Sequence, residues 1–148
     1  MSITGDFFIG GRIPTDALRT AIAHALRIDP SQIGTREMGS GHVAAGRVVL
    51  VSVASSLPGD YADQYIATGE TGDSDRFERV LSAVARELGV PVLIGAGLDD
   101  PDIMSLITPD GTRQHVFAEQ DEDDGGIRNT PEMRRLIEQS KPASSRAA

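Results

Sequence analysis

The chain has 148 residues and a formal net charge of −8, with 39% apolar and 24% charged residues. These values are typical of one globular domain with a single core. It contains no cysteine, which excludes disulfides, thiolate metal sites and a cysteine nucleophile. Residues 1–6 lack the features of a secretory signal, and the longest apolar run, residues 48–54, is far shorter than the roughly 20 residues that span a bilayer. We therefore expect a soluble, cytoplasmic protein with no membrane association.

The first half of the chain predicts strands around one helix. A short strand at residues 7–9 precedes two glycines, and a helix follows over residues 15–28, with Thr15 as its N-cap. Residues 33–38 predict a weaker strand, and the β-branched residues 47–55 predict a central one. Residues 57–72, rich in glycine and proline, predict a long loop in which Tyr61 and Tyr65 fit one helical turn. The buried stripe of the helix is expected to contain Leu18, Ile22, Ala25 and Leu26.

A second helix and a strand follow in the middle of the chain. The helix is expected over residues 75–88 and ends at Gly89, where a left-handed residue is favoured. Residues 91–95 then predict a strand. The apolar face of the helix consists of Phe77, Leu81, Val84 and Leu88.

A hairpin and a third helix complete the expected elements. Residues 103–108 and 112–118 flank the turn sequence Pro109-Asp110-Gly111, so they predict an antiparallel hairpin with Met104 opposite Val116 and Ile103 opposite Phe117. Thr130 and Pro131 then begin a short helix. Residues 1–140 are expected to form one domain and residues 141–148 a disordered tail. We predict an α+β fold: a mostly antiparallel, split-βαβ-like sheet with two main helices on one face, a C-terminal hairpin and a short terminal helix.

The net charge comes from one segment, residues 99–124. It holds nine acidic residues against one base, Arg113, while thirteen acids and thirteen bases elsewhere cancel. A surface charged on one side attracts basic proteins and repels nucleic acid, and the thirteen arginines form no basic stripe. We therefore expect a basic protein partner, with no nucleic-acid and no membrane partner. Its binding site, here called the acidic face, consists of Asp99, Asp100, Asp102, Glu119, Asp121, Glu122, Asp123 and Asp124.

Three other patterns in the sequence bear on cofactor and metal chemistry. Residues 39–44 satisfy a loose Gly-x-Gly-x-x-Ala pattern but lead into a strand instead of a helix, so a flexible connection is favoured over a dinucleotide site. Asp121, Asp123, Gly126 and Glu132 match anchor positions of a calcium-binding EF-hand loop over residues 121–132, but Gly125 stands where an oxygen ligand is required. The histidines, His24, His42 and His115, have no short ligand spacing. We expect no cofactor, no metal and no catalytic residues.

Residues 83–117 combine three features: Leu88-Gly89-Val90-Pro91-Val92-Leu93-Ile94, then Asp99-Asp100-Pro101-Asp102, and then the hairpin through Pro109-Asp110-Gly111. In these features the stretch resembles small bacterial toxin-immunity proteins. The resemblance implies a cytoplasmic protein that neutralises a cognate toxin by tight binding, with acidic side chains against a basic toxin.

Two other functions remain open. The small size and acidic character are similar to those of class I type III secretion chaperones, which wrap a segment of an effector. A small enzyme could use the acidic segment to hold a divalent metal ion. The sequence favours a binding protein over an enzyme.

Overall fold

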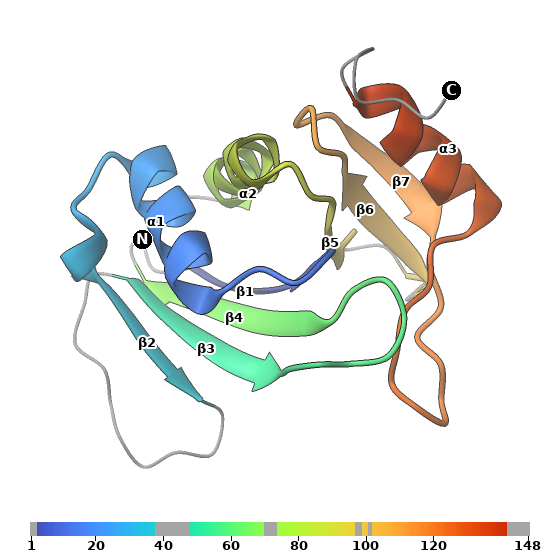
Figure 1. Ribbon diagram of the computed structural model, residues 1–148, viewed down its shortest axis with the longest axis horizontal. Coiled ribbons are helices and arrows are strands. Elements are labelled where there is room, and N and C mark those ends of the chain that lie inside the picture. Colours follow the sequence, from blue (N-terminus) through green and yellow to red (C-terminus); the bar gives the residue numbers. More distant parts are fainter. Residues whose placement is uncertain (1–2, 38–47, 70–73, 97–98, 101, 142–148) are drawn as a thin grey trace.

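The computed structural model describes residues 3–37, 48–69, 74–96, 99–100 and 102–141. In this part of the chain, seven strands form one sheet in the order β2-β3-β4-β1-β5-β6-β7, with three α-helices (Figure 1). Within it β2 and β3 pair in parallel and the other neighbours pair antiparallel, which confirms the predicted α+β fold. The elements are β1 Ile3–Ile9, α1 Thr15–Leu26, a 3₁₀ turn Pro30–Gln32, β2 Ile33–Glu37, β3 Val48–Ala54, β4 Asp63–Gly69, α2 Ser74–Leu88, β5 Val92–Gly95, β6 Ile103–Ile107, β7 Arg113–Phe117 and α3 Pro131–Ser140.

Helices α1 and α2 cover one face of the sheet (Figure 1). The main core lies between them and the sheet, and it includes Phe7, Ile9, Leu18, Ile22, Leu50, Tyr65, Leu81 and Val84. The predicted helix faces are confirmed for Leu18, Ile22 and Leu26 on α1, while Ala25 packs at the margin of the core. On α2, Phe77, Leu81 and Val84 are buried and Leu88 is only partly buried. Burial of these aliphatic stripes against strand residues supplies the main stabilisation of both helices.

Helix α3 closes the opposite face. Met133 is fully buried there, and Leu136 and Ile137 pack beside it. Thr130 caps the helix as predicted, because its hydroxyl accepts a hydrogen bond from the Met133 N–H at 3.2 Å. This second core consists of Phe8, Tyr61, Leu93, Leu106, Val116, Ala118, Ile127 and Met133.

The predicted hairpin register is confirmed. Met104 lies opposite Val116 and Ile103 lies opposite Phe117 in the antiparallel pair of β6 and β7. Gly111 takes a positive φ of 87° in the connecting turn. The hairpin therefore delivers the chain before β6 and the chain after β7 to the same end of the sheet.

The loop predicted over residues 57–72 is wrong for residues 63–69, whereas residues 57–62 make only isolated bridges and residues 70–72 lie outside the described part of the chain. Residues 63–69 form β4, which pairs with β1 on one side and β3 on the other. Tyr61 and Tyr65 do not share a helical turn, since Tyr61 belongs to the second core and Tyr65 to the main core. The surrounding glycines and proline suggested a loop, whereas Tyr65, Ile66 and Thr68 favour a strand and β4 is paired on both sides.

Two helix ends also differ from the prediction. Pro14 occupies the N-cap position of α1, and Thr15 is its first helical residue. The helix ends at Leu26, because Arg27 adopts a left-handed conformation with φ 58°. As predicted, α2 ends before a left-handed residue, Gly89, with φ 68°.

Several predictions fall outside the described residues: the Gly-x-Gly-x-x-Ala segment 39–44, His42, the ends of two expected strands at Met38 and Arg47, and residues 142–148 of the expected tail. None of the helices in the described part of the chain combines the length and apolarity needed to cross a bilayer.

Candidate acidic binding site

The β6–β7 hairpin joins the two halves of the acidic face. At its open end the Ala118 N–H donates a hydrogen bond to the Asp102 carbonyl oxygen at 2.8 Å. Residues 99–102 therefore enter the hairpin beside residues 119–124, which leave it. Chain segments about twenty residues apart in sequence form one acidic surface.

A hollow of about 660 Å³ lies at this end of the hairpin. Four residues of the acidic face line it, Asp102, Glu119, Asp121 and Glu122, whereas the other four are not part of its wall. Phe117 contributes the apolar side, and 60% of its surface is exposed. We call this site the acidic hollow, and its full lining is Asp102, Phe117, Glu119, Gln120, Asp121, Glu122, Gly126, Arg128 and Thr130.

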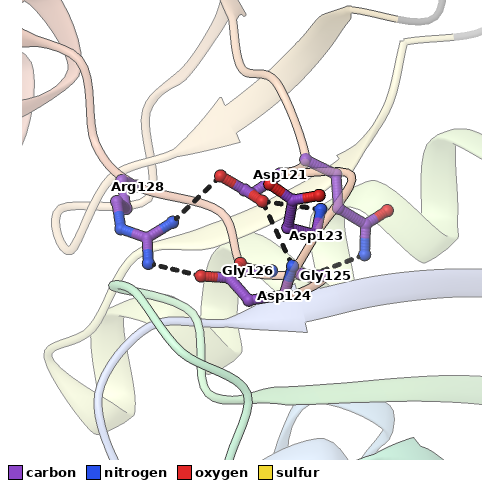
Figure 2. A network of polar contacts seen from close by, with 7 residues as sticks. Asp121, Asp123, Asp124, Gly125, Gly126 and Arg128 are labelled. Atoms are coloured by element: carbon purple, nitrogen blue, oxygen red, sulfur yellow. Dashed lines mark hydrogen bonds and ion pairs between the residues drawn. The ribbon is translucent and has the colours of Figure 1, made fainter.

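The loop after β7 is held by its own carboxylates. Asp121 Oδ1 accepts hydrogen bonds from the N–H groups of Asp123 at 2.8 Å and Asp124 at 3.1 Å. Asp124 Oδ1 accepts another from the Gly126 N–H at 2.8 Å (Figure 2). Asp121 and Asp124 are therefore structural residues of the loop, because their carboxylates satisfy backbone donors that would otherwise depend on water.

Arg128 lies within the acidic face. Its guanidinium donates to Asp124 Oδ2 at 2.8 Å and lies 3.9 Å from Asp121 Oδ2 (Figure 2). The Arg128 hydrogen bond and that of the Gly126 N–H hold the pKa of Asp124 below its ordinary value, and Asp124 in turn raises the pKa of Arg128. Sequence reasoning assigned the acidic segment a single base, Arg113, but that side chain pairs with Glu78 on α2.

The fold divides the eight carboxylates into two groups. Asp100, Asp121 and Asp124 accept hydrogen bonds from the backbone of their own segments. Within the described residues the other five carboxylates make no hydrogen bond or ion pair, so they are the ones available to a partner: Asp99, Asp102, Glu119, Glu122 and Asp123.

Residues 59–61 fasten this loop to the sheet. The Asp60 N–H donates to the Ile127 carbonyl oxygen at 2.8 Å, and Asp60 Oδ2 accepts from the Asn129 N–H at 2.7 Å. The Tyr61 hydroxyl donates to Asn129 Oδ1 at 2.7 Å. Burial, and secondarily the Asp60 charge, raise the pKa of Tyr61, so the hydroxyl remains a neutral donor.

Glycine is needed where the two segments meet. A Cβ added to Gly126 would lie 2.3 Å from the Pro58 carbonyl oxygen. Backbone groups therefore hold the loop against residues 58–61 with no side chain between them. The loop that follows β7 is therefore held in place by contacts with residues 58–61. These residues lie in the segment that the sequence predicted to be a loop.

The structure also places the candidates for metal chemistry. Of the EF-hand anchors, the Asp121 carboxylate accepts a hydrogen bond from the Asp123 N–H and lies 3.9 Å from the Arg128 guanidinium. Glu132 is an exposed residue of α3. The described residues contain no group of three or more histidines, cysteines or acids positioned to hold a metal ion. His24 Nδ1 lies 2.8 Å from Glu87 Oε1 on the surface, and His115 is exposed on β7.

A second hollow, of about 420 Å³, lies at the start of α1 on the side of the main core. The Thr15 and Tyr65 hydroxyl oxygens are 3.1 Å apart at its wall, and Asp16, Arg36 and Glu37 bring charges of both signs. Both hollows therefore mix charges of both signs: this one has Asp16, Glu37 and Asp63 against Arg36, and the acidic hollow has Asp102, Glu119, Asp121 and Glu122 against Arg128.

Comparison of the chain with protein-family models, with curated proteins and with solved structures found no match.

Proposed function

We propose that this protein binds a basic protein partner through the acidic face and neutralises it, as a cytoplasmic protein of the toxin-immunity type. The proposal rests on one observation: carboxylates that make no hydrogen bond or ion pair within the described residues, here called uncommitted carboxylates, share a hollow with the exposed Phe117. Exposed phenylalanine is costly in water, and an aromatic side chain ringed by polar groups is the usual centre of a protein interface.

The charges and the aromatic ring contribute differently to binding. Carboxylates on one side of the molecule attract a basic partner over a distance and orient it, which mainly increases the rate of association. Phe117 adds apolar area that is buried only in the complex, so it mainly slows dissociation. Arg128 and the backbone bonds fix the loop before binding, which reduces the entropy lost on association.

An immunity protein and a secretion chaperone would both use such a surface, and they differ in what happens to the partner. An immunity-type inhibitor binds a folded toxin and abolishes its activity. A chaperone binds an extended effector segment and leaves the activity of the folded effector unchanged. The acidic face is compatible with either function, and the immunity-type function is favoured because the sequence resemblance of residues 83–117 implies it.

The test is capture of partners from cells of the native host by the tagged wild-type protein. The variant Asp102→Asn/Glu119→Gln/Glu122→Gln removes three uncommitted carboxylates that line the acidic hollow. A matched control, Asp6→Asn/Asp16→Asn/Glu37→Gln, removes the same charge from β1, α1 and β2.

We expect a basic protein that the wild type and the control retain and the hollow variant loses. Purified partner should then lose its own activity when one equivalent of this protein is added. Equal retention by all three proteins, or a bound partner that is acidic, would contradict the proposal.

A further inference from the structure

We propose that the partner binds by adding an extended, basic-ended segment to the free edge of β7, next to the acidic hollow. The inference rests on the proposed function and specifies how the partner is held. Strand β7 is the last strand of the sheet and pairs only with β6 among the described strands.

The hydrogen bonds between β6 and β7 involve every second residue of β7, so they show which of its backbone groups face outward. The Thr108 N–H donates to the Thr112 carbonyl oxygen at one end, and the Ala118 N–H donates to that of Asp102 at the other. Hydrogen-bonded pairs alternate along an antiparallel ladder, so Gln114 and Val116 also face β6. The N–H and carbonyl groups of Arg113, His115 and Phe117 therefore point away from the sheet.

Nothing in the described part of the chain occupies this edge. No hydrogen bond is made by the backbone of Arg113, His115 or Phe117 within the described residues. The β6–β7 register has no bulge, and β7 has no proline, so two common devices that block edge pairing are missing from it. An edge of this kind accepts an added strand.

The side chains beside the edge leave room for the residues of such a strand. A hollow of about 550 Å³ lies beside β7 on the face of the sheet that α2 covers, and Glu78, Ser105, Arg113 and His115 are in its wall. The acidic hollow lies at the Phe117 end. A segment running along β7 passes from one hollow to the other.

The charges beside β7 determine which kind of segment can bind along its free edge. Arg113 is paired with Glu78 at one end of the edge, while the uncommitted carboxylates Asp102, Glu119 and Glu122 surround the other. A segment with lysine or arginine at the end beside Phe117 complements this distribution. A second copy of the chain also carries a net charge of −8 and an acidic face of its own, so self-pairing is disfavoured.

The probe is a short synthetic peptide of alternating threonine and valine with two lysines at one end. Versions with the lysines at the amino or the carboxyl end cover both strand directions. A second form of each peptide carries N-methyl groups on alternate residues, which removes the donors facing β7 and keeps the charge. Binding is followed by NMR of the full-length protein, with amide hydrogen exchange as the readout.

We expect one direction to bind and to protect the amides of Arg113, His115 and Phe117, while those of Gln114 and Val116 are already protected by β6. N-methylation should weaken binding by about tenfold or more, since several backbone hydrogen bonds are lost together. His115→Pro should have the same effect, because it removes an outward N–H and no bond to β6. His115→Ala is its control and should bind like the wild type.

Several results would overturn strand addition. They are no binding at millimolar peptide, equal binding of the N-methylated form, or a wild type that sediments as a dimer and a His115→Pro variant that does not. The N-methylated peptides test the idea on the wild-type protein even if His115→Pro fails to fold.

A different result would contradict the proposed function while leaving strand addition supported. Binding that is sensitive to N-methylation but unaffected by salt and by the Asp102→Asn/Glu119→Gln/Glu122→Gln changes would support strand addition on the open edge and remove the role of the acidic face.

Discussion

The hydrogen bond between Tyr61 and Asn129 provides a measurable test of how the acidic face is built. The Tyr61 side chain is fully buried, and its hydroxyl donates to Asn129 Oδ1 at 2.7 Å. Asn129 is half-buried and belongs to the loop that carries the acidic residues. Removing either partner should loosen that loop without touching a charge.

The two single changes should have unequal costs. Tyr61→Phe removes one hydrogen bond, and the half-buried Asn129 amide can turn towards water, so we expect a loss of about 1 kcal/mol. Asn129→Ala leaves the hydroxyl of a fully buried tyrosine without a partner, which should cost about 1–3 kcal/mol. The double variant should cost less than the sum, with a coupling energy of about 1 kcal/mol.

The assay is urea denaturation of the four proteins in the cycle, with amide exchange of residues 119–129 measured on each. We expect faster exchange in this loop for both single variants. Tyr65→Phe is a control, since the Tyr65 hydroxyl contacts Thr15 on the other face of the sheet. A coupling energy below about 0.3 kcal/mol would refute the fastening of the loop by this pair.

Three further predictions concern the core, acid stability and calcium. Leu26→Ala should cost about 2–5 kcal/mol of unfolding free energy, and Leu88→Ala only about 1–2 kcal/mol, because Leu88 lies at the margin of the core. Equal losses in chemical denaturation would show that the helix faces are misassigned. Because the pKa of Asp124 is lowered in the folded protein, its contribution is present above its ordinary value of 3.8 and is lost as the pH falls through the lowered pKa, so Asp124→Asn should flatten the melting temperature against pH below about 4. Millimolar calcium should leave the melting temperature unchanged, because the Asp121 carboxylate is already bonded to backbone N–H groups; a rise that Asp121→Ala or Glu132→Ala abolishes would contradict this.

Much of the fold could be predicted from local patterns. The apolar spacing of α1 and α2 identified their buried faces, and the Pro109-Asp110-Gly111 turn fixed the hairpin register because a turn of given length permits one pairing. Strand β4 could not be predicted in this way. Tyr65, Ile66 and Thr68 favour a strand, but the glycines and the proline around them favour a loop, and the pairing with β1 joins residues that are far apart in the sequence.

The site was predictable only in part. A hairpin that brings Asp102 beside Ala118 follows from the register, so the meeting of the two acidic segments could be anticipated. The partnership of Arg128 with Asp124 could not, because Arg128 lies beyond the acidic run in sequence and its position depends on the loop. The exposure of Phe117 depends on which face of β7 the helices leave uncovered, and alternation along the strand does not determine that.

Attraction of a basic partner is the role that we propose for the carboxylates of the acidic face that have no partner within the described residues. Its most direct test is the association rate of the partner captured from the host, measured at low and high salt for the wild type and for Asp102→Asn/Glu119→Gln/Glu122→Gln. At low salt the variant should associate more slowly, and above about 0.1 M salt the two rates should converge, because exposed charges are then screened beyond about 10 Å. Equal association rates at every salt concentration would contradict the claim and leave these carboxylates as solvated surface charges.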